Sequence, residues 1–365
     1  MTQRRPLILA ALAIVVIAIA LLLSRPHAPS ASADRDRLLY PELKAKLDSV
    51  NTVRVVKGGE SQIVAVERKG ADWLVSDRAG YPADATKIRK FLIAAADAKL
   101  VEEKTSNPAN YAAIGVEDVS AAAATGHRVE IGGGGAPISL IVGKQAGRSS
   151  QYVRRAADKQ SWQISDSLEV PTTADVWLRK DIIDVFADRI QSATVTIGGG
   201  KPWSAVKATR TDSDFTVDGL PKGKELSSPA AANSIGSALA SLTLADVRKA
   251  SELQAQKPAA HTTFKSFDGL VVEVDGWAQD GKHYIALTTT YDEALAQRFK
   301  APPAEPAKTP GADGKPAAPV AAAAPERNVA EEVKAQNALF AGWAYEIPDY
   351  KYEAIFKPVD ELLKK

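Results

Sequence analysis

Hydrophobic and polar residues alternate in short runs along this chain, and glycines separate the runs. The first three runs occupy residues 52–57, 64–68 and 73–75, with Gly58-Gly59 and Gly70 between them. Alternation with a period of two is typical of antiparallel strands that bury one face. Glycine adopts the positive φ angles of tight turns at little cost. We therefore predict a three-stranded meander at the start of the folded region.

The same pattern returns later in the chain without a gap. Residues 52–58 match 194–200, residues 64–68 match 206–210, and residues 73–75 match 215–217. This repetition predicts that one module is present in two copies.

A helical pattern follows the meander in each copy. Asp84 is the candidate N-cap in the first, and Ser228 in the second, where Pro229 takes the first helical position at no hydrogen-bond cost. Apolar residues then recur at helical spacing, as Ile88, Phe91, Leu92, Ala95 and as Ile235, Ala238, Leu239, Leu242. Such stripes are more typical of core packing than of partner-binding faces. We predict one main packed helix in each copy.

A second hairpin closes each copy. Four glycines join residues 127–131 to 138–142 in the first, and Asp280-Gly281 joins 270–274 to 284–287 in the second. The last strands are predicted at 151–155, 162–164 and 343–348.

The copies differ in one connection, which is short in the first (144–151) and much longer in the second. Residues 301–325 of the longer one contain seven prolines and ten alanines. This composition cannot assemble a core, so we expect a disordered insertion. Asn328 and Glu331 resemble a capping box, which predicts a helix after it.

Leu7 to Leu23 is an unbroken run of seventeen apolar residues that follows Arg4 and Arg5. As a helix the run would span roughly 26 Å, enough for a thin bilayer. The positive-inside rule then places the N-terminus in the cytoplasm and the rest of the chain outside. The alternative is a cleaved secretory signal with Ala31-Ser32-Ala33 at its processing site. That site lies far beyond the apolar run, so we favour an uncleaved anchor.

Composition excludes several classes of function. The net charge is +2 over 365 residues, which is a poor match to nucleic acid. The chain has no cysteine, which excludes a lipoprotein anchor, disulfides and thiol catalysis.

No motif of known chemistry is complete. The glycine runs at 132–135 and 198–200 lack the strand–loop–helix context of a phosphate loop, and we interpret them as hairpin turns. The four histidines show no metal-ligand spacing; they are His27, His127, His261 and His283. Asp181, Asp184 and Asp188-Arg189 are a conceivable paired-carboxylate site, although caps and salt bridges in a connector explain them more simply.

The tryptophans favour a shared core over a ligand platform. Trp73 aligns with Phe215, and Trp162 corresponds in order to Trp343. Matching aromatics in two copies of a module indicate equivalent core positions. We therefore assign no catalytic, cofactor-binding or metal-ligating residue.

Segments of the first lobe carry a family resemblance, namely Tyr81-Pro82-Ala83-Asp84, residues 107–116, Val142-Gly143-Lys144, Tyr152-Val153-Arg154 and Trp162. They resemble the bacterial family called domain of unknown function 4340. The resemblance covers most of the first lobe and continues to Trp177-Leu178, but it is weaker in the second lobe. It implies a single-pass envelope protein encoded beside an ABC transporter of the gliding-motility type. It carries over no catalytic residue and implies an accessory or scaffold role.

The predicted fold is α+β. A transmembrane anchor (1–24) and a tether (25–39) precede two lobes (40–180 and 181–365), each a mostly antiparallel sheet with one main helix, related by duplication. We expect a non-enzymatic scaffold in the bacterial inner membrane, its bulk in the periplasm. It would need no cofactor and bind proteins of an ABC-type transport system. The alternative is a periplasmic module that holds a sugar, peptide or lipid between its lobes, and an enzyme ranks third.

Overall fold

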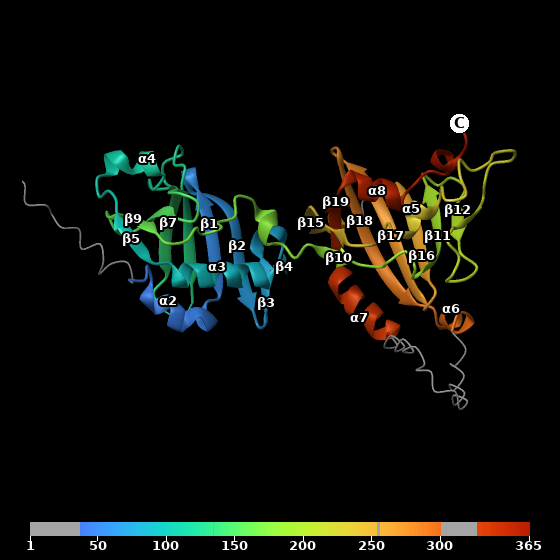
Figure 1. Cartoon of the computed structure of the whole chain (residues 1–365), viewed down its shortest axis with the longest axis horizontal. Coiled ribbons are helices and arrows are strands. Elements are labelled where there is room, and N and C mark those ends of the chain that lie inside the picture. The colour runs from blue at the N-terminus through green and yellow to red at the C-terminus, as the bar shows by residue number, and fades with distance from the viewer. Residues whose placement is uncertain (1–36, 134, 254–255, 301–326) are drawn as a thin grey trace, which may run out of the picture. The chain divides into compact units, whose positions relative to one another are not determined.

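The computed structural model describes residues 37–133, 135–253, 256–300 and 327–365 (Figure 1). The apolar run at 7–23 and the Pro/Ala-rich segment at 301–325 lie outside these ranges. Within the described ranges, no helix is long and apolar enough to cross a membrane. The fold is α+β and rich in antiparallel sheet.

Residues whose Cα atoms lie close together group into two compact units. The described part of the first unit comprises residues 37–71 and 85–173, and the second comprises residues 72–84 and 174–365. The short segment 72–84 therefore groups with the second unit, although the sequence analysis placed it inside a lobe spanning 40–180.

The first unit is built on antiparallel strands that pair in the order β2-β1-β6-β7-β8-β9-β5. Their bounds are β1 Thr52–Lys57, β2 Ser61–Lys69, β5 Leu100–Glu103, β6 His127–Gly132, β7 Ile138–Gln145, β8 Gln151–Arg155 and β9 Ser161–Ile164. The sequence pattern predicted all of these strands except β5. The turn between β1 and β2 needs glycine at position 58, because a Cβ there would lie 2.7 Å from the Ala124 carbonyl oxygen.

The helices of the first unit are α2 (Pro41–Lys46), α3 (Ala85–Asp97) and α4 (Tyr111–Ile114), with 3-10 turns η1 (Leu47–Ser49), η2 (Gly58–Glu60) and η4 (Pro108–Asn110). Helix α3 begins directly after Asp84, as predicted. Its apolar stripe is buried, with Ile88 fully covered and Phe91 4% exposed. The prediction of one main packed helix in this region is confirmed.

The second unit contains an eight-stranded antiparallel sheet in the order β13-β12-β11-β16-β17-β18-β19-β15. These strands are β11 Ile190–Ile197, β12 Trp203–Val206, β13 Thr216–Asp218, β15 Asp246–Lys249, β16 Ala260–Ser266, β17 Leu270–Gln279, β18 Lys282–Tyr291 and β19 Trp343–Ile347. The second unit also contains residues of two short strand pairs outside this sheet, β3 (Asp72–Val75) with β4 (Tyr81–Pro82), and β10 (Asp181–Ile183) with β14 (Leu242–Thr243).

The helices of the second unit are α5 (Asn233–Gly236), α6 (Glu293–Arg298), α7 (Val329–Phe340) and α8 (Asp349–Ile355), with η3 (Ser76–Arg78), η5 (Ala174–Trp177), η6 (Ala250–Glu252) and η7 (Val359–Leu362). Both α7 and α8 pack against β18 (Figure 1). Asn328 caps α7, since its side chain accepts the Glu331 N–H. This confirms the predicted helix start.

The predicted strand at 206–210 is wrong. The strand β12 ends at Val206, and its Trp203 pairs with Val195. In the first unit the corresponding Val53 pairs with Val66, much further along the chain. Gly198 and Gly199 both have positive φ and reverse the chain early, so the gap-free match fails at this strand.

The predicted helix from Ser228 to Leu242 is also wrong as a helix. Only the four residues of α5 are α-helical, and the flanking residues form turns whose N–H groups bond three residues back. Gly236, a poor helix former, is needed there because a Cβ would lie 2.8 Å from the Phe215 ring. The apolar positions are nevertheless buried; they are Ile235, Ala238, Leu239 and Leu242.

The two aromatics assigned as equivalent core residues differ in burial. Phe215 is 3% exposed, whereas Trp73 is only partly buried. The core assignment therefore holds for Phe215 and is wrong for Trp73. Trp162 and Trp343 are both buried, as predicted.

Candidate functional site

Three of the segments that carried the family resemblance, residues 107–116, 142–144 and 152–154, meet around α4 in the first unit. Tyr111 is buried at the start of this helix, and its hydroxyl donates to the Lys159 carbonyl over 2.6 Å. The guanidinium of Arg154 lies over the Tyr111 ring, 4.7 Å from its centroid. The ring thus connects α4 to the strand β8 and to the turn that follows it.

The C-terminal end of α4 is held by Lys144 of β7. The Lys144 ammonium donates to the carbonyl oxygens of Ala112 and Ala113, at 3.1 and 3.2 Å. A cation suits this position because the last carbonyls of a helix have no partner within it. Gly143 allows the close approach, since a Cβ there would lie 2.4 Å from the Ile114 carbonyl oxygen.

Arg154 is the most deeply placed charge of this cluster, with 3% of its surface exposed. Its Nε donates to the Val116 carbonyl and its Nη1 to the Asp158 carbonyl, each at 2.9 Å. A third, longer bond reaches the Ala156 carbonyl. Buried charge requires such partners. Arg154 therefore fixes the segment after α4 and the turn after β8. Its Nη2 lies 3.5 Å from an Asp118 carboxylate oxygen and makes no hydrogen bond to any described residue.

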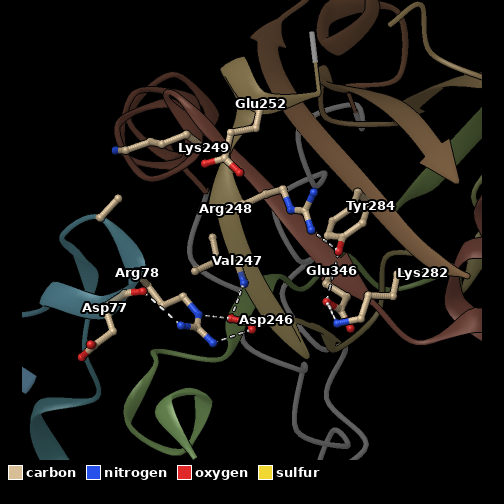
Figure 2. Close-up of a pocket in the computed structure, with 11 residues that line it drawn as sticks. Asp77, Arg78, Asp246, Val247, Arg248, Lys249, Glu252, Lys282, Tyr284 and Glu346 are labelled. Carbon is tan, nitrogen blue, oxygen red and sulfur yellow. Dashed lines mark hydrogen bonds and ion pairs between the residues drawn. The ribbon is translucent and has the colours of Figure 1, made fainter. Parts of the chain in front are cut away.

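A polar pocket of about 360 Å³ lies in the second unit (Figure 2). Four separate chain segments contribute to it: η3, the strand β15 with η6, the strand β18, and β19. The lining residues are Asp77, Arg78, Ala79, Asp246, Val247, Arg248, Lys249, Glu252, Lys282, Tyr284 and Glu346. Four of the side chains are cationic and four are anionic, so the formal charge of the lining is zero.

Arg78 and Asp246 form a two-pronged ion pair in this pocket. Arg78 Nε and Nη2 donate to the two carboxylate oxygens of Asp246, at 2.6 and 2.8 Å. These bonds raise the pKa of the Arg78 guanidinium above its usual value. The same carboxylate accepts the Val247 main-chain N–H at 2.8 Å. The pair therefore connects η3 to the edge strand β15.

The opposite wall of the pocket holds a second ion pair and a stacked arginine. Lys282 donates to Glu346 over 2.8 Å, and this bond raises the pKa of the lysine. The Arg248 guanidinium lies 4.0 Å from the centroid of the Tyr284 ring, and its Nη2 donates to the Tyr284 hydroxyl. Burial raises the pKa of that hydroxyl. Arg248 and Lys249 leave β15 in opposite directions (Figure 2). The Lys249 ammonium lies 3.4 Å from the Trp343 ring centroid.

The local sequence does not reveal this pocket. No local spacing connects residues 77–79, 246–252, 282–284 and 346, which come together only through strand pairing. The only local signal is the adjacent pair Arg248-Lys249 on a short strand, and that pair alone is typical of an ordinary solvated edge.

Three of the four histidines, His127, His261 and His283, lie on strands of the described part of the chain. His127 lies in β6, where burial lowers its pKa, and His283 in β18 bonds Asp349 at 2.9 Å. His261 is bonded to Asp275 (2.8 Å) and to the Thr263 hydroxyl (3.2 Å). His27 lies outside the described residues.

The hydroxyl–imidazole–carboxylate order around His261 is that of a catalytic triad. A triad also needs main-chain donors beside the hydroxyl to stabilise an oxyanion. The strand β16 is paired on both sides, with β11 and with β17, so its N–H groups are engaged in the sheet. We interpret the trio as a polar ladder between neighbouring strands.

The acidic cluster at 181–188 supplies caps and contacts. Asp184 accepts the Ser241 N–H at 2.7 Å, and Asp181 is an exposed residue of β10. Arg189 forms ion pairs with Asp268 and Glu332, at 2.9 and 2.7 Å. Among the described residues, no group of three or more His, Asp or Glu side chains is arranged to hold a metal ion.

A family model described as "Domain of unknown function (DUF4340)" matches residues 73–262. This range is more than half of the 365-residue chain. The chain belongs to the DUF4340 family. The matched range includes the cluster around α4 and the two pocket segments from η3 and β15. No curated protein and no solved structure matches the chain.

Proposed function

We propose that this DUF4340 protein is a non-enzymatic, membrane-anchored periplasmic scaffold that associates with an ABC-type transport system. One observation carries the proposal: Tyr111, Lys144 and Arg154, which belong to the segments that resemble the family, all bind main-chain carbonyls of their own unit. Side chains that bind main chain in this way maintain the shape of their unit. A scaffold acts through its shape and surface, so framework residues are the ones it requires.

We also propose that the two units arose by duplication. The strand order β2-β1-β6-β7-β8-β9-β5 of the first unit has the same connectivity as β12-β11-β16-β17-β18-β19-β15 of the second. In the first unit, β6, β7 and β8 are followed by β9, which pairs with β5, the strand after the helix α3. In the second unit, β16, β17 and β18 are followed by β19, which pairs with β15, a strand that comes after the helix α5. This correspondence makes β16 the equivalent of β6, and the long insertion then belongs to the β18–β19 connection.

The scaffold proposal is tested by photo-crosslinking in intact membranes. A photoreactive residue replaces Tyr350 or Phe186, which are 67% and 55% exposed and are large hydrophobic side chains. We expect at least one of them to attach covalently to subunits of a single ABC-type transport system, identified by mass spectrometry. Asp280, an exposed position at the β17–β18 turn, is the matched control and should give fewer adducts. The absence of transporter adducts from both positions contradicts the proposal.

The proposed topology has its own test. Protease added to spheroplasts should digest residues 34–365 while the chain remains in the membrane fraction, because the apolar run at 7–23 follows Arg4 and Arg5. A soluble mature chain that begins at Asp34 would show that the segment is a cleaved signal.

The pocket favours a second candidate, a periplasmic ligand-binding module. Its volume of about 360 Å³ lies at the lower end of the range typical of small-molecule sites. A binding module would gain thermal stability when sugars, peptides or lipids are added, because a ligand that binds only the folded state stabilises it.

A further inference from the structure

Among the described residues, two of the four cations of the pocket in the second unit, Arg248 and Lys249, are held by an aromatic ring rather than by a carboxylate. Arg78 is paired with Asp246 and Lys282 with Glu346, and Lys249 is directed at the Trp343 ring. Arg248 contacts Tyr284 through both its ring and its hydroxyl. Arg248 therefore has N–H donors that can bind a ligand in this pocket.

Stacking prepares Arg248 to bind a planar anion. A guanidinium has five N–H donors in one plane, and the Tyr284 hydroxyl takes a single donor, that of Nη2. The Tyr284 ring packs against the face of the guanidinium and leaves its edge available. Tyr284 is itself buried, with 2% of its surface exposed. A fixed guanidinium edge matches the two oxygens of a carboxylate better than an ammonium does.

The other charges of the lining decide between possible anions. Four carboxylates line the same pocket and would repel a phosphate dianion; they belong to Asp77, Asp246, Glu252 and Glu346. A single negative charge is tolerated, because the formal charge of the lining is zero. The pocket is also too small for a large ligand but wide enough for a carboxylate with a short polar body.

We propose that this pocket binds a carboxylate group on the edge of Arg248. The inference rests on the second candidate function, ligand binding, and gives it a chemical class. The group has two possible sources, a small free carboxylate or the C-terminal carboxylate of a peptide. Arg248 donates the bidentate hydrogen bonds, while Lys282 stays paired with Glu346.

The test uses NMR of the isotope-labelled full-length chain, read at the Arg248 side chain and the Val247 main-chain amide. Acetate and a triglycine peptide with a free C-terminus serve as probes, and the same peptide with a C-terminal amide and inorganic phosphate serve as comparisons. We expect saturable shifts with acetate or with the free peptide at millimolar concentration, and weaker binding of the amide and of phosphate. Tighter binding of the free peptide than of acetate assigns the source to a peptide terminus, and the reverse order assigns a small free carboxylate.

Variants separate recognition from folding. Arg248→Gln should weaken carboxylate binding by about tenfold, as expected for loss of a bidentate charged contact, and Arg248→Lys should restore it only partly. Arg210→Gln is the matched control, because Arg210 is an exposed arginine over the Phe267 ring in the same unit. Equal binding by the wild type and Arg248→Gln, with an unchanged fold by circular dichroism, overturns the proposal. Saturable binding of a neutral sugar without any response to carboxylates also overturns it, while leaving the ligand-binding module standing.

Discussion

Arg78 and Asp246 are joined by two hydrogen bonds although 168 positions separate them in the sequence. Asp246 opens β15, the edge strand of the eight-stranded sheet, and its carboxylate also accepts the Val247 N–H. An open edge strand exposes unpaired N–H and C=O groups that invite another chain. The arginine, the carboxylate and the amide together cover part of this edge and hold η3 against it.

Breaking this pair should loosen the segment 72–84. Each side chain is between a quarter and a third exposed, so the pair is worth about 1 kcal/mol. We expect Arg78→Lys or Asp246→Asn to lower the opening free energy of residues 72–84 by that amount in native-state hydrogen exchange, with little further loss in the double mutant. The control is Asp97→Asn, which removes the more exposed Lys44–Asp97 pair. If the control lowers the protection of residues 72–84 by the same amount, the Arg78–Asp246 pair makes no specific contribution to that segment.

Stability at acid pH should depend on Glu60. Its hydrogen bond from Arg128 lowers its pKa below the ordinary value of 4.5. Because the folded-state pKa is the lower one, the ionised carboxylate stabilises the fold above pH 4.5, and the contribution disappears as the pH falls through the folded pKa. Urea unfolding between neutral and acid pH should therefore show a smaller acid loss for Glu60→Gln than for the wild type. Glu67→Gln, at an exposed position of β2, should follow the wild-type curve.

Replacing Gly276, in the middle of β17, should lower the stability of the second unit. A Cβ at this position would lie 2.5 Å from the Phe356 ring and 2.9 Å from the Tyr352 hydroxyl, which belong to or follow α8. We expect Gly276→Ala to destabilise the second unit by about 1–3 kcal/mol through overpacking. Adding Phe356→Leu should recover part of the loss, as judged by thermal unfolding. If Gly276→Ala alone is as stable as the wild type, α8 does not pack on this strand.

Phe215 and Trp73 should respond differently to truncation. Phe215 is 3% exposed, so Phe215→Ala should destabilise the second unit by about 3–5 kcal/mol. Trp73 is partly buried, so Trp73→Ala should cost clearly less. Hydrogen exchange should show the Phe215→Ala effect near residues 194–290 rather than near 100–165. An equal loss in both variants would restore the two aromatics as equivalent core positions.

The strands and turns were predictable where one strong local rule applied. Alternation located β1, β2, β6 and β7, and the Asp280-Gly281 turn located the β17–β18 hairpin, where both residues adopt positive φ. The strand β16 was missed because Thr262 and Ser266, although buried, are polar and hide the alternation. Because β16 was missed, the hairpin β17–β18 was matched to β6–β7, whereas the proposed duplication matches β16 to β6.

Tertiary contacts overrode the local pattern at the segment 228–242. The apolar spacing there is helical, but Gly236 sits under the Phe215 ring and Ser241 adopts a φ of 47°. A ring contact from a distant strand is invisible in the local sequence. The pocket escaped prediction for the same reason, since Arg78 and Asp246 meet only after the strands pair.

The central claim is that the residues that resemble the DUF4340 family hold the main chain of their own unit. Arg154→Met tests it most directly, because the change leaves the Val116 and Asp158 carbonyls without their donor. Hydrogen exchange of the full-length chain should show residues 111–119 losing about 3 kcal/mol of protection, with β16 to β18 unchanged. Arg148→Met, at an exposed loop position, should match the wild type. Undiminished protection of 111–119 in Arg154→Met, together with loss of binding to a ligand or partner, would contradict the account and make Arg154 a recognition residue.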